Sequence, residues 1–130
     1  MNKPLKIKDV SELTGLSKHT LRYYEKIGLI DQVKRRGDGH RYYSENDVAW
    51  IEFLNRLRVT GMPISRMKTF ADLRRKGNST AGERREMLEN FKDDLYQRLT
   101  DLSKHLEAIE KKIKHYKELE KKTKSMRSKS

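Results

Sequence analysis

The C-terminal third of the chain carries an apolar repeat that only a long helix can satisfy. After Gly82 the sequence holds neither glycine nor proline, and it predicts a helix from Glu83 to about Lys122. At 1.5 Å per residue this helix is roughly 60 Å long, and so long and narrow a stripe calls for a partner helix. The apolar side chains recur at steps of three and four residues: Leu88, Phe91, Leu95, Leu99, Leu102, Leu106, Ile109, Ile113 and Tyr116.

The spacing of this repeat is typical of a coiled coil. From Leu99 onward the steps alternate strictly between three and four residues, as core positions of a two-stranded coiled coil do. The four-residue step from Leu95 to Leu99 is a stutter, which locally unwinds a left-handed supercoil. The alternative is that the helix folds back on its own N-terminal domain. The polar and basic residues 123–130 are expected to form a disordered tail.

Charge and composition indicate a polyanionic partner. The chain of 130 residues has a formal net charge of +12, with 34% hydrophobic and 38% charged residues. So polar a composition fits a small core joined to an elongated, solvated element better than a single globule. Excess positive charge favours nucleic acid, because bound cations release the counterions condensed on DNA.

The sequence argues against an enzyme and against a metal protein. It has no cysteine, which excludes disulfides, thiolate metal sites and a thiol redox switch. Its four histidines are scattered, and no glycine-rich phosphate loop or catalytic constellation is present. We therefore expect no catalytic residue, no metal and no cofactor. Because no run is apolar enough to span a bilayer and no signal region opens the chain, we expect a cytoplasmic protein without a membrane partner.

A basic helix followed by a basic hairpin is predicted within residues 17–43. Ser17 can cap this helix, because its hydroxyl accepts from free backbone N–H groups, and Gly28 can end it. A Gly-Asp-Gly turn at residues 37–39 then separates two basic arms, of which the first is 32–36. A helix and basic hairpin in this order are typical of a winged helix-turn-helix domain.

Three further helices complete the predicted N-terminal domain. The first spans residues 8–14 and ends at Gly15, the third begins after a capping box at Ser44, and the fourth runs from Pro63 to about Lys76. A second capping box is expected at Thr80. The apolar residues expected to face the core are Val10, Leu13, Leu21, Tyr24, Ile27, Val48, Ile51, Leu54, Leu57, Ile64, Met67, Phe70, Ala71 and Leu73.

Three short runs of residues in this region match the pattern of one protein family. The sequence resembles the N-terminal DNA-binding domain of MerR-family transcription regulators, with matching spacing throughout. The resemblance implies a mainly α fold: a winged helix-turn-helix domain at 1–76, a dimerisation helix at 77–122 that pairs as an antiparallel coiled coil, and a basic tail at 123–130. The matching runs are Thr20-Leu21-Arg22-Tyr23-Tyr24-Glu25, Gly28-Leu29-Ile30 and Gly39-His40-Arg41-Tyr42-Tyr43.

The resemblance also implies a function. MerR-family relatives are homodimers that bind palindromic promoter operators in double-stranded DNA. They bend and untwist the promoter spacer, and so act indirectly on RNA polymerase. Many relatives attach a ligand-binding domain after the helix, whereas only a short tail follows here, so the chain resembles a short, cysteine-free member without a separate sensor. The alternative is an excisionase-like DNA-architectural protein without an effector, although such proteins typically lack a long heptad helix.

We expect the DNA contacts to come from the basic helix and the hairpin. Arg22, Arg36 and Arg41 are predicted to bind phosphates, whereas Lys18 and His19 at the helix start are predicted to read base edges. For Arg22 the alternative is a surface ion pair with a neighbouring side chain such as Glu25. The full set of expected DNA-binding residues is Ser17, Lys18, His19, Thr20, Arg22, Tyr23, Lys26, Arg35, Arg36, His40, Arg41 and Tyr42.

Overall fold

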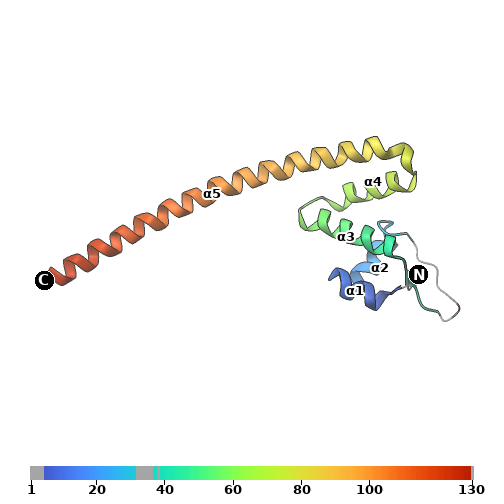
Figure 1. The fold of residues 1–130 in the computed structure, drawn as a ribbon, viewed down its shortest axis with the longest axis horizontal. Helices are drawn as coiled ribbons and strands as arrows, with labels where there is room; N and C mark the ends of the chain where they lie inside the picture. Colours follow the sequence, from blue (N-terminus) through green and yellow to red (C-terminus); the bar gives the residue numbers. More distant parts are fainter. Residues whose placement is uncertain (1–4, 32–36, 38, 130) are drawn as a thin grey trace. The chain divides into compact units, whose positions relative to one another are not determined.

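The computed structural model describes residues 5–31, 37 and 39–129 (Figure 1). The chain divides into an N-terminal unit, Met1–Glu89, and a C-terminal unit, Asn90–Ser130. Helices dominate both units, and the last helix belongs to both. In chain order the elements are β1 (Leu5–Lys6), α1 (Ile7–Thr14), α2 (Lys18–Lys26), β2 (Tyr42–Tyr43), α3 (Glu45–Val59), α4 (Ile64–Arg75), the 3-10 turn η1 (Asn78–Thr80) and α5 (Ala81–Lys129).

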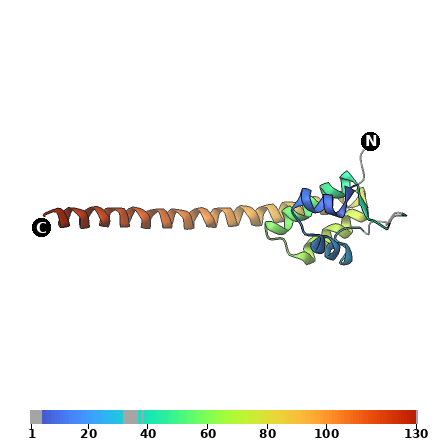
Figure 2. The same cartoon turned by 90° about the horizontal axis from the view of Figure 1, so that it is seen from below.

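The N-terminal unit packs α1 to α4 around one apolar core. Helix α1 contacts α2 and α3, and α4 contacts α3; Figure 2 shows these four helices gathered in one cluster. The cores predicted for α2 and α3 are largely confirmed. The buried apolar side chains of this unit are Val10, Leu16, Leu21, Tyr24, Leu29, Ile30, Tyr43, Trp50, Ile51, Leu54, Leu57, Met62, Met67, Phe70 and Ala71.

Three predicted helix ends are confirmed by their capping residues. The Ser17 hydroxyl accepts from the Thr20 N–H at 3.0 Å, which caps α2. At α3, Ser44 Oγ accepts from the Asp47 N–H at 3.1 Å, and Asp47 Oδ2 accepts from the Ser44 N–H at 2.8 Å. Helix α1 ends at Gly15, whose φ of 75° is left-handed and therefore favours glycine.

Two apolar residues expected in the core are exposed instead. Leu13 is 59% exposed, because α1 turns Val10 and Thr14 toward the core and leaves Leu13 beside that face. The Thr14 hydroxyl donates to the Val10 carbonyl, one turn earlier. Ile64 is 40% exposed because it is the first residue of α4, at the border of the unit. Pro63 precedes α4 as its N-cap and not as its first helical residue.

The junction between α4 and α5 differs from the predicted capping box. The buried Thr80 hydroxyl donates to the carbonyl oxygens of Leu73, at 2.5 Å, and Gly77, at 2.9 Å. Arg84 Nε donates to that hydroxyl at 3.2 Å, and Arg84 Nη2 donates to the Gly77 oxygen at 3.1 Å. Thr80 and Arg84 thus fasten the start of α5 to the last turn of α4.

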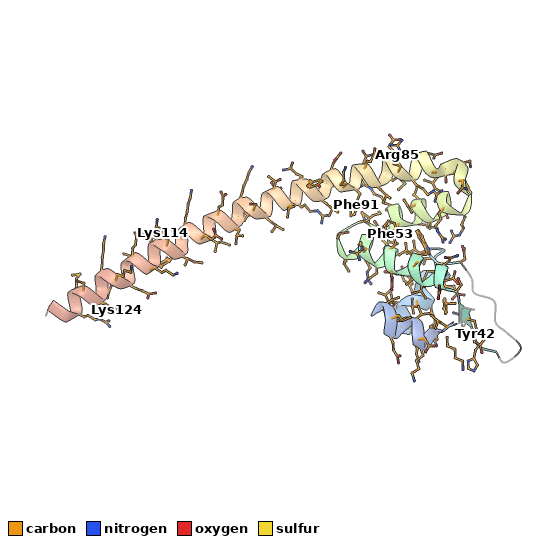
Figure 3. The ribbon with its side chains drawn as sticks, in the orientation of Figure 1. Tyr42, Phe53, Arg85, Phe91, Lys114 and Lys124 are labelled. Carbon is orange, nitrogen blue, oxygen red and sulfur yellow. The ribbon has the colours of Figure 1, made fainter. Side chains whose placement is uncertain are left out.

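An aromatic cluster joins α3 to α4. The rings of Trp50 and Phe70 stack with centroids 5.9 Å apart, and Phe53 lies 5.9 Å from Phe70. Figure 3 labels Phe53 on α3. The guanidinium of Arg74 lies 4.3 Å from the centroid of the Trp50 ring, and Trp50 Nε1 donates to the Leu29 carbonyl at 2.9 Å. Trp50 therefore connects α3, α4 and the residues that follow α2.

The two strands form one antiparallel pair, with Leu5 opposite Tyr43 and Lys6 opposite Tyr42. The second arm of the predicted hairpin thus pairs with the residues before α1. The first arm, Gln32–Arg36, lies outside the described residues.

Burial of Tyr43 predicts a loss of stability in alkaline solution. Burial raises the pKa of its phenol above the ordinary 10.0, and the Glu25 carboxylate adds to the rise. The unfolded chain therefore releases this proton first, so the free energy of unfolding is unaffected below pH 10 and falls above it. In Tyr43→Phe the fall is expected to be shallower, which urea unfolding between about pH 9 and 11 would measure. Equal slopes in both proteins would contradict this expectation.

Helix α5 is longer than the sequence predicts. It runs to Lys129, whereas a disordered tail was expected from Thr123. The reason is that residues 117–124 are mostly Lys, Glu and Leu, which favour helix and pair at four-residue steps. Figure 3 labels Lys114 and Lys124 on this helix. No helix in the described part of the chain is both long and apolar enough to cross a membrane.

Candidate nucleic-acid interface

One face of α2 is exposed and basic. Its residues Leu21, Tyr24 and Glu25 are buried, whereas its basic side chains are exposed. Tyr23 is 45% exposed, and its ring lies 6.3 Å from that of Tyr24. Ser17, the N-cap, is also exposed, and Thr20 is half-buried. The exposed basic residues of this face are Lys18, His19, Arg22 and Lys26.

A shallow cavity of about 250 Å³ lies beside the start of α2. Residues of α2, α3 and α4 line it, and the Arg58 guanidinium lies 6.0 Å from the centroid of the Tyr24 ring. Sequence analysis missed Arg58 and Ile64 here, because no motif marks them and only the fold brings the end of α3 to the start of α2. The lining residues are His19, Thr20, Tyr23, Tyr24, Arg58 and Ile64.

The end of the predicted hairpin is held by an ion pair. Arg41 Nη1 lies 2.6 Å from Glu25 Oε2, and the side chains are 25% and 8% exposed. Glu25, the alternative partner considered for Arg22, pairs with Arg41. His40 is exposed and Tyr42, labelled in Figure 3, is half-buried. The predicted contacts Arg35 and Arg36 lie outside the described residues.

The residues that enter the hairpin are held from α4. Arg75 Nε lies 2.5 Å from Asp31 Oδ1, and Arg75 Nη2 donates to the Gly28 carbonyl. Arg75 Nη1 also contacts Asp72 Oδ1 at 3.0 Å, one turn earlier in α4. Sequence analysis did not single out Arg75, because Asp31 and Gly28 lie more than forty residues away in the chain.

The apolar repeat of α5 is exposed over most of its length. Leu88 and Leu95 are half-buried and Phe91 is only 7% exposed, so these three offer less free surface. The repeat also extends beyond its predicted end, through Leu119 and Met126, which are 42% and 73% exposed. We call the exposed predicted positions the apolar stripe: Leu99, Leu102, Leu106, Ile109, Ile113 and Tyr116.

Within the residues that the structure describes, no three His, Cys, Asp or Glu side chains are placed to hold a metal ion.

Comparison with known proteins identifies the family. The family model for the MerR HTH family regulatory protein matches residues 5–73, which include α1 to α3, most of α4 and the exposed basic residues of α2. The chain belongs to the MerR family. An uncharacterized HTH-type transcriptional regulator of Haemophilus influenzae is 33% identical to this MerR-family chain, over 82% of the chain and 78% of the relative.

Solved structures of MerR-family regulators share this fold. A putative MerR family transcriptional regulator from Listeria monocytogenes has 35% identity and a TM-score of 0.81, over 86% of this chain and 85% of that one. HiNmlR, a MerR family regulator lacking the sensor domain and bound to promoter DNA, has 30% identity and a TM-score of 0.80, over 89% and 92%. This MerR-family protein is a DNA-binding transcription regulator, and its named relatives are transcriptional regulators.

Proposed function

We propose that this regulator acts as a homodimer on a palindromic promoter operator. Two copies pair through antiparallel α5 helices, each presenting one DNA-binding domain. In this proposal residues 1–76 bind DNA, residues 77–122 form the pairing helix and residues 123–130 add positive charge beyond it. The exposed apolar stripe carries the proposal, because six large apolar side chains at heptad spacing on one helix are seldom left in water.

The symmetry of such a dimer sets the form of its operator. An antiparallel pair has a two-fold axis, so the two basic surfaces meet two half-sites in opposite orientation. A winged helix-turn-helix places its recognition helix in the major groove, and here α2 has the exposed basic face that this role needs. A relative of almost the same length, HiNmlR, is bound to promoter DNA, which supports this arrangement.

The proposed contacts fall into two groups. Arg22 and Lys26 are exposed cations midway along and at the end of α2, and Tyr23 offers a phenolic hydroxyl, so these residues bind phosphates. Lys18 and His19 lie at the exposed start of α2 and read base edges. Arg58 lines the same cavity as His19 and adds a further phosphate contact. The predicted hairpin supplies the remaining contacts on the flanking backbone.

The dimer then acts on the promoter by deforming it. Bending and untwisting the DNA between the two half-sites costs a few kcal/mol, which additional phosphate contacts offset. The deformation brings promoter elements into register for RNA polymerase, so the polymerase is affected through the DNA. The long helix α5 with its apolar stripe favours this dimeric regulator over an excisionase-like architectural protein, because such proteins typically lack a helix of this kind.

Selection of bound genomic fragments tests the operator. Purified full-length protein should enrich fragments with one inverted repeat upstream of a small set of genes. Nuclease footprints on these fragments should show enhanced cleavage at the centre of the repeat, where the DNA is distorted. Enrichment of asymmetric sites would contradict the dimer, and a footprint without central distortion would contradict activation by bending while leaving repression open.

Arg22→Ala tests the phosphate contacts of α2. Losing one charged hydrogen bond in each half-site should weaken operator binding by roughly tenfold per half-site. Because each protomer loses one phosphate contact, the slope of log K against log salt concentration should fall by about two for the dimer. Fluorescence anisotropy across a salt series measures both. Arg85→Ala is the control, because Arg85 is an exposed arginine paired with Glu89 on α5; equal losses in both variants would contradict the assignment.

A further inference from the structure

Two ion pairs hold the two ends of residues 31–41, which we call the wing segment. Both pairs join an acidic side chain to an arginine, and each arginine comes from a different part of the N-terminal unit. Asp31 at the first end pairs with Arg75 of α4, and Arg41 at the second end pairs with Glu25 of α2. Asp31 and Arg41, the first and last residues of the wing segment, are therefore each held to the N-terminal unit by a charged contact.

The first end is fixed by several bonds in addition to the ion pair. Arg75 binds the Asp31 carboxylate and the Gly28 carbonyl with different nitrogens, so its planar guanidinium spans the turn after α2. Between these partners Leu29 and Ile30 are buried. The Leu29 carbonyl accepts from Trp50 Nε1. The direction in which the chain leaves α2 is thus set by α3 and α4.

The second end is fixed by burial. Glu25 is 8% exposed, although glutamate is rarely buried without a charged partner. Its bond to Arg41, at 2.6 Å, joins α2 to the residue that directly precedes β2. Tyr43 is 1% exposed and pairs with Leu5 in the sheet. Arg41 and β2 therefore hold the returning chain against α2.

Glu25 and Asp31 are acidic residues close to the proposed DNA-binding surface. The protein binds a polyanion, and negative charges close to its binding surface oppose that binding. We propose that Glu25 and Asp31 are positioning residues, which raise DNA affinity by holding the two ends of the wing segment. This inference rests on the proposed function, because it assumes that the wing segment contacts DNA. It makes Arg41 and Arg75 supports for the wing segment and not primary phosphate ligands.

Whether Asp31→Asn raises or lowers DNA affinity distinguishes this positioning role from a purely electrostatic effect. The variant removes a negative charge, so electrostatics alone predicts equal or tighter DNA binding. Loss of a positioning contact predicts weaker binding, by up to about fivefold for a partly exposed pair, with an unchanged salt slope. Arg75→Lys keeps the net charge but cannot span both partners, and it should weaken binding as well. Anisotropy with an operator fragment, at fixed and varied salt, measures these values.

Asp72→Asn is the matched control. Asp72 contacts the same arginine and carries the same charge, but it belongs to α4 and not to the wing segment. Its replacement should leave DNA affinity unchanged or slightly higher. Glu25→Gln gives the corresponding test at the second end: binding should weaken even though Arg41 is retained and one negative charge is lost.

A second readout does not involve DNA. Trypsin can cleave after Lys34, Arg35 and Arg36, and cleavage there should be faster in Asp31→Asn and Arg75→Lys than in Asp72→Asn or the parent protein. If Asp31→Asn binds DNA as tightly as the parent while Arg22→Ala binds weakly, the positioning role is wrong and the proposed DNA surface stands. If Arg22→Ala also binds like the parent, the proposed DNA surface fails and the positioning role fails with it.

Discussion

Leu106→Asp is expected to separate the two copies and to abolish operator binding at concentrations where the parent binds. Leu106 is 56% exposed in the single chain and lies in the middle of the apolar stripe. Burying a leucine against a partner helix is worth about 1.5–3 kcal/mol, and a symmetric dimer buries two. The substitution also places two carboxylates in the seam. The dissociation constant of the dimer should therefore rise by roughly 10²- to 10⁴-fold.

Sedimentation equilibrium at micromolar concentration measures this change. The parent should have twice the chain mass of 15.5 kDa, and Leu106→Asp should have the chain mass itself. Ala108→Asp adds the same charge within the same turn, on the opposite side of the helix, and should remain a dimer. Any general effect of aspartate on helix stability is shared by both variants. A dimeric Leu106→Asp protein would show that the apolar stripe is not the pairing surface.

Arg41→Ala is expected to be among the most destabilising single changes in the N-terminal unit. It removes the ion-pair partner of a carboxylate that is 8% exposed, and a buried charge that loses such a partner is costly. Because Arg41 itself is 25% exposed, the loss should lie at the lower end of the usual range, about 3 kcal/mol. Glu25→Gln should cost less, because the remaining guanidinium can still reach solvent.

Thermal unfolding of the two single variants and the double variant tests whether Arg41→Ala costs more stability than Glu25→Gln. Circular dichroism near 222 nm and Trp50 fluorescence follow the unfolding. The double variant Glu25→Gln with Arg41→Ala should be more stable than Arg41→Ala alone, since it no longer buries the charge. Arg85→Ala removes an exposed pair four residues apart and should cost less than about 0.5 kcal/mol. If Arg41→Ala and Arg85→Ala cost the same, the Glu25 contact contributes little to folding.

The sequence predicts the regular elements well because their signals are local. Ser17, Ser44 and Gly15 act through bonds to residues within four positions, so their patterns are visible in the chain itself. The apolar periods of α2 and α3 are equally local, and most residues of the two predicted faces are buried. Ile27 and Val48 are half-buried. The sequence underestimates the length of α5, because a polar and basic segment indicates disorder, whereas the lysines in it also favour helix.

What the sequence could not predict are contacts between distant segments. Arg75 lies 44 residues from Asp31, and Arg41 lies 16 residues from Glu25. No period or motif links such pairs, and Arg41 was therefore assigned to phosphate alone. Thr80 illustrates the same difficulty at shorter range. Its spacing from Glu83 matches a capping box, but its hydroxyl donates to Leu73 because η1 turns it back toward α4.

The fastening of α5 to α4 at Thr80 and Arg84 has a mechanical consequence. If the first turn of α5 rotates, either the hydrogen bonds from Thr80 to Leu73 and from Arg84 to Gly77 break, or the end of α4 moves with it. The end of α4 carries Arg74, which lies over the Trp50 indole of α3, and Arg75, which pairs with Asp31 after α2. The first turn of α5 and the end of α4 are therefore expected to move together, and with them the contacts that Arg74 and Arg75 make to Trp50, Asp31 and Gly28.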